Sequence, residues 1–314
     1  MRSLPKTNIN KFAAFVIFYY ACMGLSGCSV FSSSGATDEN GLYGAHEVAG
    51  KLESPDLKEA SGIAASKCQP DVFWTHNDSG DKALLYAINL KGEHLGVWNV
   101  TGATNRDWED IATLKTNGKC YVLIGEIGDN DHKHKRLAVY RVEEPTIAEN
   151  AITSTAKAPL ETAEMSATYM VYPNEKHDAE ALLAHPSNGE LYIVTKSSNS
   201  PSHVYKFKPR FEGEEQTMDK VADMTVPAVP NGSITGGDIS PDGKRVILCD
   251  YFSGYEFELP EGAGFDAIWK QRPLRVDLGA RELGEAVAFS ADGSFVIAVS
   301  EKRNTSVNIA RRKN

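Results

Sequence analysis

Acidic residues recur at one position of a six-residue motif that the chain repeats five times. The third position of the motif is a glutamate in three copies, at Glu109, Glu180 and Glu285. Carboxylates gathered around a narrow opening repel one another unless a cation, a proton or a hydrogen-bond donor lies between them. Calcium takes about six to eight oxygen ligands and tolerates irregular geometry better than magnesium does. The pattern predicts a calcium site; the alternative is that these carboxylates only accept hydrogen bonds from backbone amides and water.

Further polar side chains are expected at the same opening, because antiparallel neighbours bring the start of one strand beside the end of the next. The additional predicted metal ligands are Asp78, Asp110, Asp129 and Asp238. The predicted ligand-binding residues are His76, Asn77, Lys196, Asp250 and Glu301. Two of the segments concerned, 77–81 and 128–131, resemble calcium loops but lack the EF-hand spacing, so they are also compatible with plain polar turns.

Catalytic residues are not assigned by the sequence. A glycosidase needs two carboxylates on either side of a sugar, and Glu109 and Glu285 could fill those roles, as could other acids of the ring. Calcium-dependent phosphoester hydrolysis needs cationic groups beside the metal, for which Lys196, Arg303 and His76 are the basic candidates. A serine hydrolase is disfavoured, because no Gly-x-Ser-x-Gly elbow occurs. Whether the protein is an enzyme stays open at this point.

The motif copies mark the innermost strands of a repeated unit. They are Glu59–Ala64, Asp107–Ala112, Asp178–Leu183, Thr235–Ser240 and Leu283–Ala288. Each copy is followed by a turn and by two more β-rich runs, and four of the turns contain Asn-Gly or Asp-Gly, the dipeptides of tight hairpins. The copies are spaced by 48 to 71 residues. A four-stranded propeller blade needs about 40–50 residues, so the longer repeats must contain inserts, which we place at 146–159 and 209–216.

These features predict an all-β protein, a five-bladed β-propeller over residues 45–314, with six blades as the alternative if an insert hides a degenerate blade. The segment after the last motif copy is long enough for three strands only. The N-terminal run His46–Leu52 is therefore expected to supply the fourth strand of the last blade, which ties the two ends of the propeller together.

Three cysteines lie within the predicted propeller. Cys68 and Cys120 each precede the second strand of neighbouring blades, so a disulfide between them is one expectation and two free buried thiols are the other. Cys249 stands inside a strand and is expected to pack as a small hydrophobic residue.

The N-terminal segment is typical of an exported lipoprotein. Three basic residues precede the apolar run 12–25, and Leu25-Ser26-Gly27-Cys28 resembles the bacterial lipobox. We expect residues 1–27 to be a signal peptide, and residues 28–44 to be the lipidated (palmitate-carrying) Cys28 and a Ser/Gly-rich flexible tether. Ser29 favours the outer membrane, facing the periplasm or the surface, over the inner membrane. The alternative is a buried apolar helix with an incidental cysteine.

Net charge excludes one class of partner. The formal charge is −9 and the isoelectric point is about 5.5, so nucleic-acid binding through a general positive field is not expected. No apolar stretch is long enough for a polytopic membrane protein. The expected partners are the membrane, through the lipid anchor, and a small ligand or an envelope protein.

Four segments in the first two repeats resemble known families of propellers. They are Ala60–Ala64, Thr75–Gly80, Leu85–Leu90 and Asp107–Ala112. They look like the opening of the SdiA-regulated propellers and are similar to the esterase-like, phytase-like propellers. The resemblance implies a calcium-binding propeller and, for the phytase-like relatives, phosphoester chemistry. The chain departs from these families in blade number and at Gly237, which replaces the motif acid in the fourth copy.

The function these observations favour is a lipid-anchored, extracytoplasmic propeller whose acidic, calcium-binding opening acts as a ligand- or protein-binding module. The alternative is a calcium-dependent phosphoester or ester hydrolase that uses the same site. A purely structural scaffold in an envelope complex is a third possibility.

Overall fold

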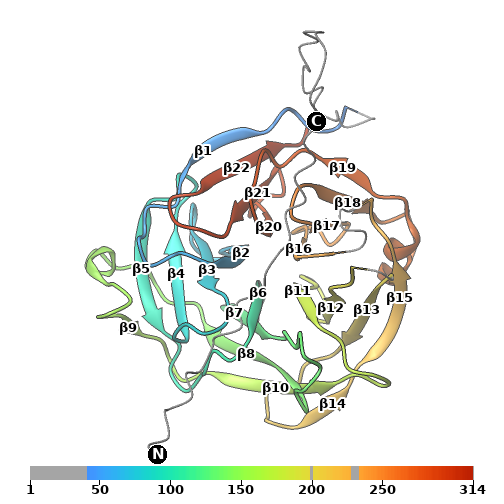
Figure 1. The fold of residues 1–314 in the computed structure, drawn as a ribbon, viewed down its shortest axis with the longest axis horizontal. Coiled ribbons are helices and arrows are strands. Elements are labelled where there is room, and N and C mark those ends of the chain that lie inside the picture. Colours follow the sequence, from blue (N-terminus) through green and yellow to red (C-terminus); the bar gives the residue numbers. More distant parts are fainter. Residues whose placement is uncertain (1–40, 199–200, 228–232, 314) are drawn as a thin grey trace, which may run out of the picture. The chain divides into compact units, whose positions relative to one another are not determined.

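Five sheets, each with four antiparallel strands, stand around a common centre and form a β-propeller, and two of them gain a short parallel strand at the outer edge (Figure 1). The structure is a computed structural model that describes residues 41–198, 201–227 and 233–313. The predicted signal peptide, the lipidation site Cys28 and residues 28–40 of the predicted tether lie outside the described residues. The five-bladed fold is confirmed, and no sixth blade occurs among the described residues.

Strands of the same rank occupy the same layer of each blade. The innermost strands are β2 (Ala60–Ala65), β6 (Trp108–Thr116), β11 (Ala179–Ala184), β16 (Gly236–Ile239) and β20 (Gly284–Phe289). The second strands are β3 (Phe73–Asn77), β7 (Lys119–Glu126), β12 (Leu191–Thr195), β17 (Arg245–Cys249) and β21 (Phe295–Ser300). The third strands are β4 (Leu84–Ile88), β8 (Leu137–Glu143), β13 (Ser202–Phe207), β18 (Gly254–Glu258) and β22 (Ser306–Arg311). The outermost strands are β5 (His94–Asn99), β10 (Ser166–Val171), β15 (Asp219–Met224), β19 (Leu274–Val276) and β1 (Glu47–Lys51). All five motif copies therefore form innermost strands, as predicted.

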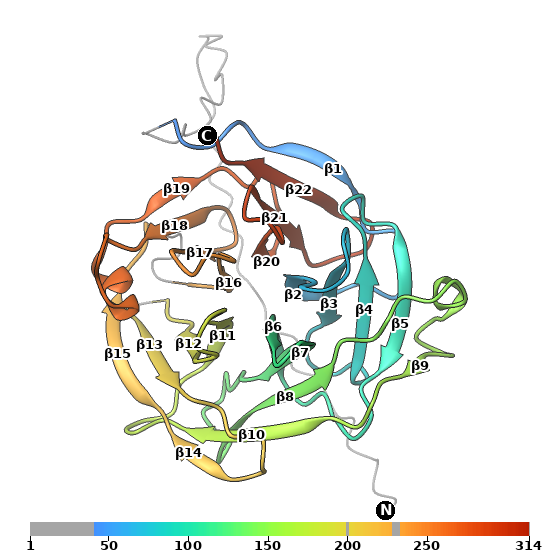
Figure 2. The ribbon, with the colours of Figure 1, turned by 180° about the vertical axis from the view of Figure 1, so that it is seen from behind.

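The fifth blade closes the ring with strands from both ends of the propeller. β1 pairs antiparallel with β22, with Glu47 opposite Ile309, and the two strands lie side by side in both views (Figure 2). This confirms the fourth strand predicted from the run 46–52. The ordered chain begins earlier than predicted, however, because Tyr43 is buried, forms a β-bridge with Arg312 and donates a hydrogen bond to Glu256 (2.5 Å). Residues 42–44 thus belong to the propeller and not to a flexible tether.

Inserts from one blade cover the outer edge of the blade before it. The insert of the second blade contains a short 3₁₀ helix, η1 (Ala151–Thr153), and β9 (Leu160–Glu161), which pairs parallel with β5 of the first blade. The insert of the third blade contains β14 (Glu215–Thr217), which pairs parallel with β10. In the fourth blade the 3₁₀ helix η2 (Phe265–Lys270) packs beside β15 instead. Covered edges cannot pair with strands of other chains, which protects the molecule from aggregation.

The hydrophobic core consists of five clusters, each between two neighbouring blades. Both faces of each blade are therefore buried, which explains the uninterrupted apolar runs of strands such as β12 and β17. The cluster between the first two blades contains Trp74, Trp98 and Trp108, and Trp74 meets Trp98 edge to face at 5.4 Å between ring centroids. The three tryptophans are packing residues. None of the described residues form a helix long and apolar enough to cross a membrane.

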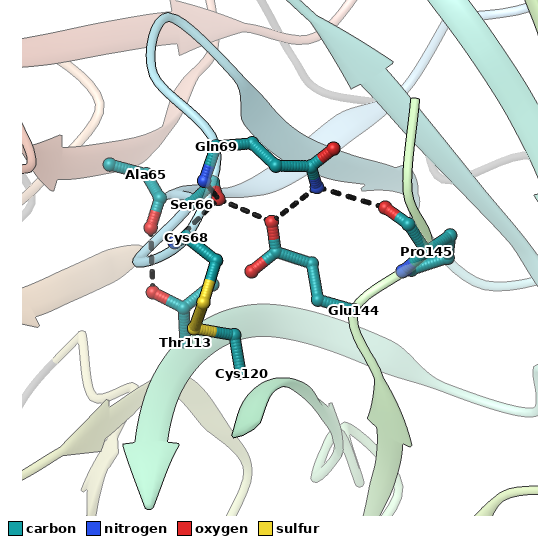
Figure 3. The surroundings of a disulfide bond; sticks show 8 residues. All are labelled: Ala65, Ser66, Cys68, Gln69, Thr113, Cys120, Glu144 and Pro145. Atoms are coloured by element: carbon teal, nitrogen blue, oxygen red, sulfur yellow. Dashed lines mark hydrogen bonds between the residues drawn. A yellow bond between two sulfur atoms is a disulfide. The ribbon is translucent and has the colours of Figure 1, made fainter. Parts of the chain in front are cut away.

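The end of β2 is joined covalently to the second blade. Cys68 and Cys120 form a disulfide, one of the two arrangements expected for them, while Cys249 is free and buried (Figure 3). Beside the disulfide, the Gln69 side-chain amide donates to Glu144 (2.7 Å) and to the carbonyl of Pro145 (2.9 Å). The joint therefore holds the first blade to the start of the insert that covers its edge.

Candidate functional site

The three motif glutamates each occupy an irregularity in their strand pairing. The register between β6 and β7 shifts around Glu109, that between β11 and β12 shifts around Glu180, and that between β20 and β21 shifts around Glu285. A β-bulge redirects a side chain and is common beside functional sites. In the fourth blade the ladder of β16 and β17 is regular, and the motif residue there is Gly237. Every motif glutamate therefore lies at an irregularity, and the first blade has one as well, between Ala60 and Ile63, where the motif residue is Ser61.

Two groups of three acidic side chains form among the described residues, at the predicted opening, where β6 and β11 begin and β3 ends. One consists of Asp78, Asp107 and Glu109, and the other of Glu109, Asp178 and Glu180; in each group one ligand oxygen per residue lies within 4.8 Å of the others. Glu109 belongs to both groups. We call these five residues the mouth cluster. The donor set is all oxygen, which is the kind of site that calcium prefers.

Burial and mutual repulsion raise the pKa values of the mouth cluster. For Glu109, burial followed by the charges of Glu180 and Asp78 raises the pKa well above its ordinary value. Burial raises the pKa of Glu180 to about 7, against the opposing effect of Lys196. Burial, assisted by Asp107, raises the pKa of Asp78 to about 6. Without a cation, the mouth cluster therefore holds protons near neutral pH.

Lys196 supplies one positive charge to the mouth cluster. Its amino group donates to Oε1 of Glu180, and it lies 5.5 Å from the centroid of the Tyr251 ring. Burial is the largest single effect and lowers the pKa of Lys196, but the charges and hydrogen bonds of Glu180 and Tyr251 together outweigh burial, so the net shift is upward and the amine stays charged. Oε2 of Glu180 is buried and has no hydrogen-bond partner. One oxygen of the mouth cluster is thus left for a further ligand.

Glu285 lies beside the mouth cluster but is not part of it. Burial, then the charges of Glu180 and Glu301, raises the pKa of Glu285 to about 10, and a hydrogen bond with Glu301 adds to the shift. Glu285 therefore keeps its proton at neutral pH. The hydrogen bond joins two residues that the sequence assigned separately, Glu285 to the metal and Glu301 to a ligand.

Asp110 and Asp238 have a different environment from that predicted. Asp110 accepts the backbone N–H groups of Ile111 and Leu182, both at 2.8 Å. Asp238 accepts those of Ile239 (2.8 Å) and Phe289 (3.0 Å). Each carboxylate thereby links its innermost strand to that of the following blade. Neither belongs to the mouth cluster, so for these two residues the structure favours the alternative of backbone-amide acceptors.

Three other predicted site residues hold turns together. Asp129 accepts the backbone N–H of Lys133 (2.6 Å), and Asp250 accepts those of residues 252 and 253. The side chain of Asn77 accepts two backbone N–H groups, from residues 58 and 59, and donates to Asp81. His76 is fully buried, its ring meets Trp108 edge to face, and burial lowers its pKa to about 4. Of the predicted ligand-binding residues, only Lys196 and Glu301 contact the acidic groups described above.

A polar pocket of about 450 Å³ adjoins the mouth cluster. Asp178 belongs to both, and Lys196, which is paired with Glu180 of the mouth cluster, also lines the pocket. The remaining lining residues are Asn130, His132, His177, Thr195, Ser197, Ser198, Pro201, His203 and Ser233. With one proline as its single apolar side chain, the pocket suits a hydrophilic ligand. The predicted metal ligands do not include Asp107 and Asp178; both are the first residues of their motif copies, and that shared position is the signal that points to them.

Comparisons with known proteins add little to the site. No protein-family model matches the chain, and no curated protein matches it. A solved structure of a gluconolactonase from Xanthomonas campestris, described as important in glucose secondary metabolic pathways, is similar with 10% sequence identity and a TM-score of 0.45. The match covers 86% of this chain and 95% of that chain. Such a similarity bears on neither activity nor ligand, and membership in the SdiA-regulated or phytase-like families stays a prediction.

Proposed function

We propose that the mouth cluster binds one calcium ion through Glu109, Asp178 and Glu180, and that the ion and the polar pocket together bind a hydrophilic ligand. The observation that carries this proposal is the buried Oε2 of Glu180, which has no hydrogen-bond partner although two other carboxylates lie within reach of the same point. An unpartnered buried carboxylate oxygen is costly, and a bound cation removes the cost. Asp78 and Asp107 would supply further oxygens.

The test is the calcium content of the purified protein, together with its thermal melting before and after chelation. We expect about one calcium per chain and a fall in Tm on chelation that calcium reverses, because the ion binds the folded state alone. Glu180→Gln should abolish both effects.

Glu144→Gln is the matched control for this variant. Glu144 also has a buried oxygen without a partner, but it lies beside the disulfide and has no place in the mouth cluster. Glu144→Gln should therefore show the same fall in Tm on chelation as the wild type. Absence of calcium from the wild-type protein, with no response of Tm to chelation, would rule out the calcium site.

The second candidate function is calcium-dependent hydrolysis of a phosphoester or ester at the same place. It is favoured by Lys196, whose charged amine lines the pocket next to the mouth cluster and can bind an anionic oxygen of a substrate. A bound calcium would neutralise developing negative charge there. Turnover of a phosphoester or ester that is lost in Glu109→Gln, while folding persists, would establish this function over simple binding.

We further propose that the propeller is tethered to the cell envelope by lipid on Cys28, on the outer-membrane side. The lipobox-like sequence and the Ser/Gly-rich segment after it support this proposal. Labelled palmitate should enter the wild-type protein and not Cys28→Ala. Release of the wild-type protein into the soluble fraction would contradict the anchor.

A further inference from the structure

The polar pocket contains three histidines, and in each of them one ring nitrogen forms a hydrogen bond that orients the ring. They come from different parts of the propeller: His132 from the loop after β7, His177 from the residue pair before β11, and His203 from β13. All three line the same pocket. The rings of His177 and His203 lie 4.9 Å apart between centroids. The sequence prediction gave none of them a role at the mouth.

Each partner fixes which ring nitrogen keeps its lone pair. Nδ1 of His132 lies 2.9 Å from the carbonyl oxygen of Lys176, which can only accept, so Nδ1 carries the proton and Nε2 is free. Nδ1 of His203 is paired in the same way with the carboxylate of Asp223, which again leaves Nε2 free. 

The third ring is oriented through a tyrosine. Nε2 of His177 lies 3.0 Å from the hydroxyl of Tyr205, and that hydroxyl donates to Asn174 (3.2 Å). The hydroxyl therefore accepts from Nε2, and Nδ1 of His177 is the free nitrogen.

We propose that His132, His177 and His203 form a binding site for a zinc-like transition-metal ion, separate from the calcium site. Neutral imidazoles with one nitrogen held by a carboxylate, carbonyl or hydroxyl are the form in which histidines bind such metals. Imidazole nitrogen selects zinc, copper or nickel, whereas the all-oxygen mouth cluster selects calcium. The three free nitrogens are not gathered at one point in this structure, so the exposed His132 side chain must give up its hydrogen bond to Lys176 and rotate, whereas His177 and His203 can keep their partners. Three histidine ligands would leave a fourth position of the metal to water or to the ligand in the pocket.

The experiment is calorimetric titration of the purified, chelator-treated full chain with Zn²⁺ in the presence of excess calcium, which occupies the mouth cluster. We expect one zinc per chain. His132→Ala and His203→Ala should each weaken binding by at least about tenfold, and Asp223→Asn, which removes an orienting partner, by about 10–100-fold. Cobalt in place of zinc should give the visible absorption of a nitrogen-ligated ion in the wild type, and this absorption should be reduced in His132→Ala and His203→Ala.

Matched variants separate this site from the calcium site. His46→Ala removes an exposed histidine whose Nδ1 is also paired with an aspartate, Asp277 (2.8 Å), but which does not line the pocket, so zinc binding should persist. Glu180→Gln should abolish the calcium response and leave zinc binding intact. Because His132 is exposed, His132→Ala should fold, and it can test the zinc site even if His203→Ala does not fold. Zinc binding that survives both histidine variants, or that is lost in Glu180→Gln, or no zinc binding by the wild type, would overturn the proposal.

Discussion

Two sets of buried carboxylates stand next to each other in this propeller and differ in what satisfies them. Asp110 and Asp238, in the regular part of the innermost strands, accept backbone N–H groups of two successive blades. Glu109 and Glu180, at the bulges, face other carboxylates, and Oε2 of Glu180 has no partner. Glu109 and Asp110 are consecutive residues, so a shift of one position separates a residue that stabilises the fold from one available to a ligand.

The difference shows how the propeller combines stability with a charged site. The aspartates connect the blades through hydrogen bonds that are complete within the protein. The mouth cluster is incomplete and is held in place by strands that the aspartates fix. Stability and binding should therefore respond to different substitutions, and the following predictions test this separation, from the largest expected effect to the smallest.

Asp110→Ala should have the largest effect on stability. It leaves two buried N–H groups, those of Ile111 and Leu182, without an acceptor, at about 1–3 kcal/mol each, so the free energy of unfolding should fall by about 2–6 kcal/mol. Chemical denaturation measures this. Asp110→Asn keeps one acceptor oxygen, so its free energy of unfolding should fall by less than that of Asp110→Ala. If Asp110→Ala lowers the free energy of unfolding by less than Glu109→Gln does, the structural role of the aspartate is contradicted.

Removal of the disulfide should lower stability without affecting the mouth. The double variant Cys68→Ser, Cys120→Ser loses a cross-link between residues 52 apart in sequence, which is worth about 2–4 kcal/mol in the unfolded-state entropy model. The change in Tm caused by chelator should equal that of the wild type. If the chelator effect disappears as well, the mouth cluster and the far end of the first two blades are coupled and the separation fails.

Gly237→Ala tests why the fourth blade lacks the motif acid. A Cβ at this position would lie 2.5 Å from Cδ2 of Leu248 and 2.9 Å from the carbonyl oxygen of Ile247. In the absence of a bulge there is no space for a side chain, and we expect a loss of about 1–3 kcal/mol in unfolding free energy. Ser61→Ala, at the same motif position in the first blade, is the comparison and removes only one hydrogen bond. An unchanged denaturation midpoint for Gly237→Ala would refute the steric explanation.

Glu285→Gln should change how stability depends on pH in the chelated protein. Burial raises the pKa of Glu285 from 4.5 to about 10, so between pH 5 and pH 8 the folded state holds a proton that the unfolded state has lost. The contribution of this group is complete below the unfolded pKa and is lost as pH rises, by at most about 1.4 kcal/mol per pH unit. The variant should therefore show a shallower fall in stability with rising pH. Identical slopes for the two proteins would show that Glu285 is ionised.

Sequence was sufficient for the arrangement of strands, because the motif recurs with hairpin turns after it and each copy falls on an innermost strand. It also predicted that Glu109 and Glu180 lie close together, as they do, since a repeated position in a closed ring places its residues around one centre. It could not distinguish Glu109 from Asp110, because the distinction depends on a bulge and on amides of the next blade. For the same reason it could not show that the side chains of Asp129 and Asn77 accept backbone N–H groups of turns. The sequence also could not show that Tyr43 belongs to the folded propeller, because its hydrogen-bond partner Glu256 is more than 200 residues away in the chain.

The pairing of β1 with β22 has a consequence for how the protein reaches its native state. The contact joins Glu47 to Ile309, so nearly the whole propeller must be synthesised before β1 finds its partner. Contacts between such distant residues slow folding, because chain entropy is lost before the contact repays it. During that interval the outer edge of β22 is open to strands from other molecules. We therefore expect closure of the fifth blade to be a slow step of folding, at which a chaperone that shields β22 would raise the yield of native protein.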